Sequence, residues 1–153
     1  MLVLGYSEIA FETFYDVLME LFDELFSKSR HEILELFSEE GGNSDYYTWY
    51  MRLITSVSMK LDADRYIPYI DLPDIDTFCK SEVEPMGKEC EQPQIIALTT
   101  YLGIKVHIEY LDGKPFEEKI GLSQMKFPDP EGNSTFEPIV LLYRPGHYDI
   151  LVN

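Results

Sequence analysis

Residues 141–151 read Leu-Leu-Tyr-Arg-Pro-Gly-His-Tyr-Asp-Ile-Leu, with apolar runs on either side of a proline–glycine turn. Apolar runs that flank a tight turn predict a β-hairpin, with strands over residues 139–143 and 147–152. Alternate side chains of a strand share a face, so His147 and Asp149 are expected to lie together. A carboxylate there can accept a hydrogen bond from one imidazole nitrogen and leave the other as a general base. The same spacing describes an ordinary surface pair, so alone it does not establish catalysis.

The sequence before this hairpin carries the period of amphipathic helices, with apolar residues every three or four positions. The expected helices span residues 9–26, 33–37, 46–59, 75–84 and 92–102. Ser44 or Asp45 is the expected cap of the third helix, and Asp74 is the expected cap of the fourth. The aromatic cluster at residues 46–50 is most simply explained by packing, with a binding platform as the alternative.

After Gly103 the apolar period changes to two. Residues 104–110 alternate apolar and polar side chains, which predicts a half-buried strand. Asp112-Gly113 is a hairpin signal, so residues 115–120 are expected to pair back onto that strand. The prolines and glycine of residues 122–136 predict a surface loop.

Helices followed by strands predict an α+β fold in which the helices pack on an antiparallel sheet. The sequence shows no internal repeat and no linker. We therefore expect a single domain over residues 1–153, mainly helical over residues 1–102 and made of strands and hairpins over residues 103–153.

The composition argues against several classes of partner. A net charge of −16 disfavours nucleic acids and anionic membranes, because binding either one requires clustered Lys and Arg. The first residues lack the basic region of a secretory signal, and no apolar run approaches the roughly 18 residues of a membrane span. Two cysteines do not make a disulfide framework. We therefore expect a soluble protein of the cytoplasm, present also in the nucleus, with no nucleic-acid or membrane partner.

The sequence also predicts neither a metal site nor a nucleotide site. His31, His107 and His147 are far apart in the chain, and Cys79 and Cys90 lack the Cys-x-x-Cys spacing of zinc ligands. There is no phosphate-loop or dinucleotide-binding motif. No cofactor is expected.

Further stretches accompany the hairpin in a fixed order. Residues 78–86 read Phe-Cys-Lys-Ser-Glu-Val-Glu-Pro-Met; the others lie at residues 5–25, 47–56, 95–98 and 108–112. Together with residues 141–151, these stretches resemble the otubain branch of the ovarian-tumour (OTU) cysteine proteases, the peptidase C65 type. The resemblance extends over nearly the whole chain, and several ordered blocks are more specific than any single motif.

The resemblance implies a papain-like cysteine-protease fold of the OTU type. It also implies a ubiquitin thioesterase or isopeptidase activity that removes ubiquitin from conjugates by Cys-His-Asp chemistry. In this chemistry His147 is the general base and acid, and Asp149 orients it. The implied partners are ubiquitin or polyubiquitin and, in addition, ubiquitin-conjugating enzymes.

The family's nucleophile lies in a Gly-Asp-Gly-Asn-Cys-Phe-Tyr-Arg segment that this sequence lacks, and Met1 falls after its place. We therefore expect the N-terminal part of the fold to be missing and the chain alone to be inactive. Cys79 is expected to be a buried structural thiol. Cys90 stands between Glu89 and Glu91, whose negative charge disfavours a thiolate. Neither cysteine is predicted to replace the nucleophile.

Three hypotheses for the function remain open. The chain can be an incomplete otubain-like deubiquitinase that carries only the His–Asp part of the site. It can instead be a catalytically inactive module that binds ubiquitin or a conjugating enzyme. It can also be a non-functional truncated paralogue that does not fold stably. Loss of a buried helix would expose apolar surface, which costs a folding free energy of about 25 cal/mol per Å².

Overall fold

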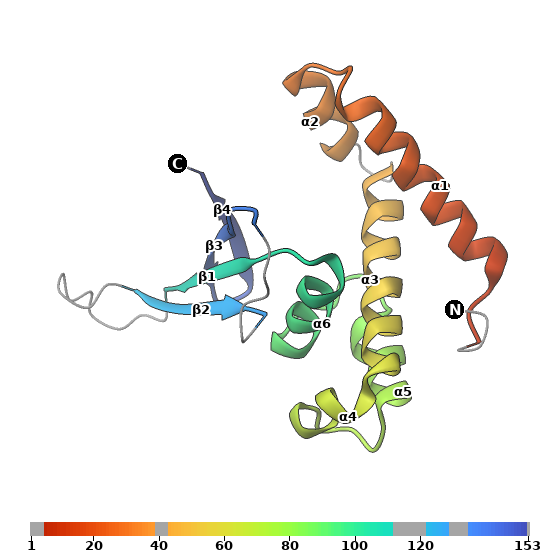
Figure 1. Cartoon of the computed structure of the whole chain (residues 1–153), viewed down its shortest axis with the longest axis vertical. Helices are drawn as coiled ribbons and strands as arrows, with labels where there is room; N and C mark the ends of the chain where they lie inside the picture. The colour runs from red at the N-terminus through yellow and green to blue at the C-terminus, as the bar shows by residue number, and fades with distance from the viewer. Residues whose placement is uncertain (1–4, 39–42, 112–121, 129–134, 153) are drawn as a thin grey trace. The chain divides into compact units, whose positions relative to one another are not determined.

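The computed structural model describes residues 5–38, 43–111, 122–128 and 135–152 (Figure 1). The chain divides into two compact units, Met1–Lys88 and Glu89–Asn153. In its described residues the first unit is helical, and the second combines a helix with a four-stranded sheet. The organisation of residues 1–153 as a single domain stays a prediction.

The first unit is built on two long helices, α1 (Glu8–Leu25) and α3 (Asn43–Leu61), which lie side by side (Figure 1). Leu18 and Leu21 of α1 form a buried cluster with Tyr47 of α3. Phe14 and Trp49 add an aromatic contact, with ring centroids 5.5 Å apart, so the aromatic residues of α3 take part in packing. The remaining elements are α2 (Arg30–Ser38), α4 (Ala63–Tyr66), the 3-10 turn η2 (Ile67–Tyr69), α5 (Ile75–Phe78) and the π-helical turn η3 (Cys79–Val83).

Two helix starts bear on the predicted caps. Asp74 caps α5, because its Oδ1 accepts the backbone N–H of Thr77 at 2.7 Å, and this prediction is confirmed. Helix α3 begins at Asn43, so Ser44 and Asp45 lie inside its first turn and the predicted caps there are wrong. A carboxylate in the first turn still suits the positive end of the helix dipole.

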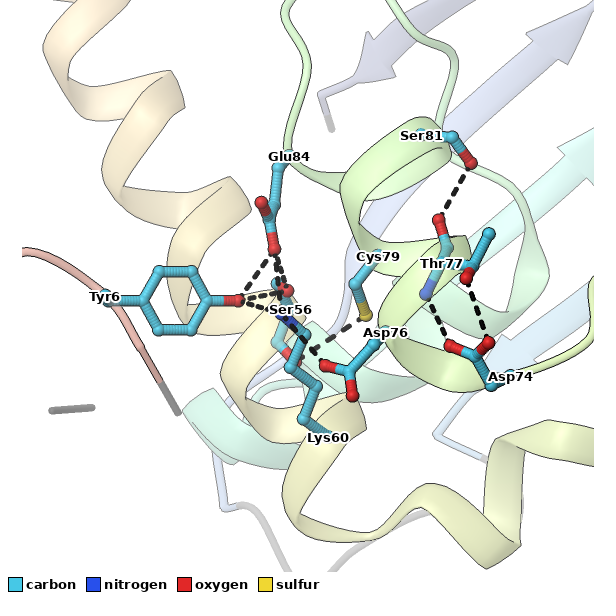
Figure 2. A network of polar contacts seen from close by, with 9 residues as sticks. All are labelled: Tyr6, Ser56, Lys60, Asp74, Asp76, Thr77, Cys79, Ser81 and Glu84. Carbon is cyan, nitrogen blue, oxygen red and sulfur yellow. Dashed lines mark hydrogen bonds and ion pairs between the residues drawn. The ribbon is translucent and has the colours of Figure 1, made fainter. Parts of the chain in front are cut away.

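A polar network ties the chain before α1 to α3 and to the end of η3 (Figure 2). The Lys60 side chain is only 4% exposed; its Nζ lies 3.0 Å from Glu84 Oε1 and donates to Tyr6 Oη at 2.7 Å. The hydroxyls of Tyr6 and Ser56 each donate to the same carboxylate oxygen at 2.7 Å. Burial opposes the charge of Glu84, but these hydrogen bonds outweigh it and hold its pKa below the usual value.

Cys79 lies beside this network (Figure 2) and is fully buried. Its Sγ donates to the backbone carbonyl of Ser56 at 3.8 Å. Burial raises the pKa of the Cys79 thiol, which disfavours the thiolate that a nucleophile needs. The prediction that Cys79 is buried is therefore confirmed.

The second unit places one helix against a four-stranded sheet. Ile95 and Ile96 of α6 pack against the buried Val106, Ile108 and Phe127 of the sheet. The strand order is β2-β1-β3-β4. The elements are α6 (Gln92–Leu102), β1 (Val106–Tyr110), β2 (Ser123–Phe127), β3 (Ile139–Arg144) and β4 (His147–Leu151).

The strand directions correct the expected antiparallel sheet. Strand β1 pairs antiparallel with β2 but parallel with β3, so the sheet is mixed. The chain reverses once into β2 and again before β3, which returns it to the direction of β1 on that strand's other side. The predicted C-terminal hairpin is confirmed, since β3 and β4 pair antiparallel.

The partner of β1 also differs from the expectation. Residues 123–127 form β2 inside the predicted surface loop, whereas the predicted pairing segment at residues 115–120 lies outside the described residues. The sequence Ser-Gln-Met-Lys-Phe is mostly polar and stands next to prolines, so it lacks the strong alternation that predicts a strand.

With α6 packed on this sheet, the second unit confirms the α+β class. A helix that crosses a bilayer needs about 20 predominantly apolar residues. In the described part of the chain, none of the helices combines the length and apolarity needed for it.

Replacing Lys60 with Met leaves Glu84 without its cation in a partly buried place. Removing one partner of such a pair typically destabilises a protein by roughly 3 kcal/mol, so we expect a loss of about that size in urea unfolding. The same substitution at Lys28, whose pair with Glu24 is more exposed, is expected to cost less than about 1 kcal/mol. Equal losses at the two positions would contradict this assignment.

The same network predicts a pH dependence. The pKa of Glu84 is lowered, so its contribution to folding stability is lost as pH falls through its folded-state pKa. The pKa of Lys60 is raised, so its contribution to folding stability is lost as pH rises through its folded-state pKa. The stability difference between the wild type and Lys60→Met is therefore largest between these limits. A difference that stays constant across urea titrations at acidic and neutral pH would contradict the network's role.

Candidate active site

The turn between β3 and β4 brings the predicted histidine and aspartate together. His147 and Asp149 lie on the same face of β4, and Nε2 of His147 is 3.1 Å from Oδ1 of Asp149. Gly146 has φ +77°, in the left-handed region that glycine adopts without strain, and so permits the tight turn. Both side chains are open to solvent, at 57% and 45% exposure. A substrate or second reactive group can therefore reach the pair.

Asp149 has a second donor. Nη2 of Arg144 lies 2.9 Å from Oδ2 of Asp149, the carboxylate oxygen that His147 does not use. The hydrogen bond from His147, and then that from Arg144, hold the pKa of Asp149 below its usual value. Asp149 is consequently an anion at neutral pH.

The charge of Asp149 decides which nitrogen of His147 carries the proton. An ionised carboxylate can only accept hydrogen bonds, so the Nε2 atom that faces it must be the donor. In the neutral ring the lone pair is then on Nδ1. The pair is therefore set up to take a proton at Nδ1, which is the chemistry of a general base.

The opposite face of the hairpin is held by tyrosines. The ring centroids of Tyr110 and Tyr143 are 5.1 Å apart, and those of Tyr143 and Tyr148 are 4.9 Å apart. This tyrosine ladder joins β1, β3 and β4. The pKa of Tyr148 is raised to about 12, mainly because the side chain is partly buried. Since Tyr148 lies between His147 and Asp149 in the strand, its packing also fixes the direction in which they point.

Sequence reasoning missed both Arg144 and the tyrosine ladder. A tight hairpin between β3 and β4 places Arg144 directly opposite His147, so the turn held a usable signal for the arginine. The ladder had no such signal. It depends on the parallel pairing of Tyr110 with Tyr143, which joins strands far apart in the sequence.

The two cysteines lie in different units of the chain. Cys79 is buried in the first unit, and Cys90 is exposed in the segment that leads into α6. Their rejection as nucleophiles stays a prediction. Among the residues that the structure describes, no group of three or more His, Cys, Asp or Glu side chains is arranged to hold a metal ion.

A His–Asp pair on the last strand of an α+β chain is the arrangement expected of a papain-like cysteine peptidase. The model of the peptidase C65 otubain family matches residues 1–153, and the chain belongs to that family. An ovarian-tumour-domain deubiquitinating enzyme 1 of Arabidopsis thaliana is 34% identical over 97% of this chain and 53% of its own length. The human ubiquitin thioesterase OTUB1 is 35% identical over 96% of the chain and 52% of its own length.

Human ubiquitin thioesterase OTUB2 is similar to the same extent, at 34% identity over 99% of this chain and 62% of its own length. The chain thus spans about half the length of the curated relatives it matches. A solved complex of h/ceOTUB1 with ubiquitin aldehyde and UBC13~Ub has a TM-score of 0.84 at 29% identity, covering 97% of this chain and 58% of that one. The expected OTU fold is therefore confirmed.

The low pKa of Asp149 can be tested by removing its histidine. In His147→Ala we expect the Asp149 carboxyl to titrate at higher pH than in the wild type, because its main donor is gone. Carboxyl ¹³C NMR across acidic pH measures both midpoints. In the wild type the pair persists above the Asp149 midpoint and is lost as pH falls through it.

Asp74 is the internal control for this titration. Its pKa is lowered by the backbone and side-chain hydrogen bonds of Thr77 in the first unit, so His147→Ala should leave its midpoint unchanged. An Asp149 midpoint that does not move, or one that moves together with the midpoint of Asp74, would contradict the assignment.

Proposed function

We propose that this chain supplies the histidine–aspartate part of an otubain-type deubiquitinase, which removes ubiquitin from conjugates. The observation that carries the proposal is the 3.1 Å contact between His147 Nε2 and Asp149 Oδ1, within a chain that the otubain family model matches throughout. Relatives named ubiquitin thioesterases and a deubiquitinating enzyme support the same reaction class.

In the proposed reaction, Nδ1 of His147 accepts the proton of a cysteine thiol, and the thiolate attacks the carbonyl carbon of the isopeptide bond. The carbon–nitrogen bond then breaks, and the proton on Nδ1 passes to the departing amine. Water, activated by the same nitrogen, hydrolyses the thioester and restores the thiol. Asp149 stays ionised throughout and holds His147 through Nε2.

In this proposal neither Cys79, which is buried with a raised thiol pKa, nor Cys90, which stands between two glutamates, supplies that thiol. We therefore expect the coding sequence upstream of Met1 to supply a Gly-Asp-x-Asn-Cys segment. The protein extended through that segment should be labelled at its cysteine by a ubiquitin–vinyl probe. His147→Asn should slow labelling by roughly 100-fold or more, since a general base contributes about 10²–10⁴-fold. Cys90→Ser is the control and should leave labelling unchanged.

Labelling of the 153-residue chain itself at Cys79 or Cys90 would overturn their rejection as nucleophiles. An upstream sequence without such a cysteine, or full labelling of the His147→Asn protein, would contradict the enzymatic proposal.

A second candidate function is binding without cleavage. It is favoured by solved relatives in which OTUB1 is complexed with ubiquitin aldehyde and with UBC13~Ub or UBCH5B~Ub. In this case the purified chain should bind a ubiquitin-charged conjugating enzyme in isothermal titration calorimetry. Binding should be unchanged in His147→Asn, because no proton transfer is involved.

The same titration separates the remaining hypothesis. A chain that stays soluble and folded but binds neither ubiquitin nor the charged conjugating enzyme contradicts the binding candidate. A chain that is recovered only as aggregate favours a non-functional truncated paralogue, since exposed apolar surface drives association.

A further inference from the structure

Arg144 contacts Asp149 directly, and the proposed reaction gives it no role. It is the last residue of β3 and lies directly opposite His147 in the hairpin register. Its Nη2 donates to Oδ2 of Asp149 at 2.9 Å. Each oxygen of the carboxylate therefore has its own donor, Arg144 from β3 and His147 from β4.

This division of the two oxygens has a geometric consequence. A carboxylate held at one oxygen can still turn about its Cβ–Cγ bond, because that torsion is broad. A carboxylate held at both oxygens, by donors on two hydrogen-bonded strands, has its plane set by both contacts. We propose that Arg144 is a positioning residue: it holds Oδ2 of Asp149 so that Oδ1 keeps facing Nε2 of His147.

The arrangement also argues against a competing effect of the arginine. If Arg144 drew Asp149 away from the histidine, the His147 contact would be broken, or both donors would crowd one oxygen. Instead the two contacts coexist at 2.9 and 3.1 Å on different oxygens. The planar guanidinium suits this task, because it holds a donor in a fixed direction as a flexible ammonium does not.

A purely structural role is a weak explanation for this pair. Arg144 and Asp149 are 53% and 45% exposed, and ion pairs this open to water add little to folding stability. We therefore expect Arg144 to affect which nitrogen of the His147 ring carries the proton, and to change the free energy of unfolding very little. This inference rests on the proposed function for its importance to catalysis, but the ring itself can be observed without any activity.

The test is ¹⁵N NMR of the histidine ring in the chain as it stands, at a pH where His147 is neutral. In the wild type the tautomer with the proton on Nε2 should predominate. In Arg144→Gln, which removes the charge and the planar fork, the ratio of the Nε2–H to the Nδ1–H tautomer should fall roughly two- to fivefold, the scale of an exposed ion pair. Arg144→Lys should lie between the two.

Two further variants make the result interpretable. Asp149→Ala removes the acceptor and should shift the tautomer ratio at least as far as Arg144→Gln does. Lys126→Gln is the matched control: it removes one positive charge from β2, where Lys126 lies opposite His107, and should leave the ratio unchanged. Urea midpoints of Arg144→Gln and Lys126→Gln should both stay close to the wild-type value.

The outcomes separate this inference from the proposed function. If Asp149→Ala shifts the tautomer ratio and Arg144→Gln does not, or if Arg144→Gln strengthens the Nε2–H form, the positioning role is wrong and the His–Asp pair stands. If Asp149→Ala leaves the ratio unchanged, the His147–Asp149 pair on which the proposed function depends is wrong. A loss of stability in Arg144→Gln that matches its tautomer shift overturns the inference in favour of a structural role.

Discussion

The antiparallel pairing of β3 with β4 is the constraint on which the candidate site depends. A strand sends alternate side chains to opposite faces, so one register decides both faces at once. On one face this register brings Arg144 opposite His147, which lies two positions before Asp149 in β4. On the other it joins Tyr143 to Tyr148. A slip of one residue would take Arg144 out of register with His147 and would separate Tyr143 from Tyr148.

The chain uses ion pairs in two different ways, and solvent exposure distinguishes them. Lys60 is almost completely buried, so its bonds to Glu84 and Tyr6 act in a medium that screens them weakly, and they bear on folding. The pair of Arg144 with Asp149 stands in water. Water screens its attraction but leaves the direction of the hydrogen bond, so this pair contributes orientation.

The two faces of the β3–β4 hairpin differ: one is packed and the other is exposed. The tyrosine ladder packs beside the apolar core that α6 covers, while His147 and Asp149 remain open to a substrate on the other face. An anionic aspartate with two donors keeps the imidazole in one tautomer. In the proposed reaction this hairpin supplies the histidine and the aspartate, and a different segment brings the thiol to Nδ1.

Local sequence was enough to predict the helices, the C-terminal hairpin and the proximity of His147 to Asp149, because each depends on residues a few positions apart. It was also enough for the family resemblance. Tertiary structure decided what depends on distant residues. The pairing of β1 with β3 made the sheet mixed and stacked Tyr110 on Tyr143, and a mostly polar segment became β2 because β1 offered it a partner. Only the folded hairpin showed that Arg144 and His147 take separate oxygens of Asp149, since hydrogen-bond direction depends on side-chain positions that no spacing in the sequence records.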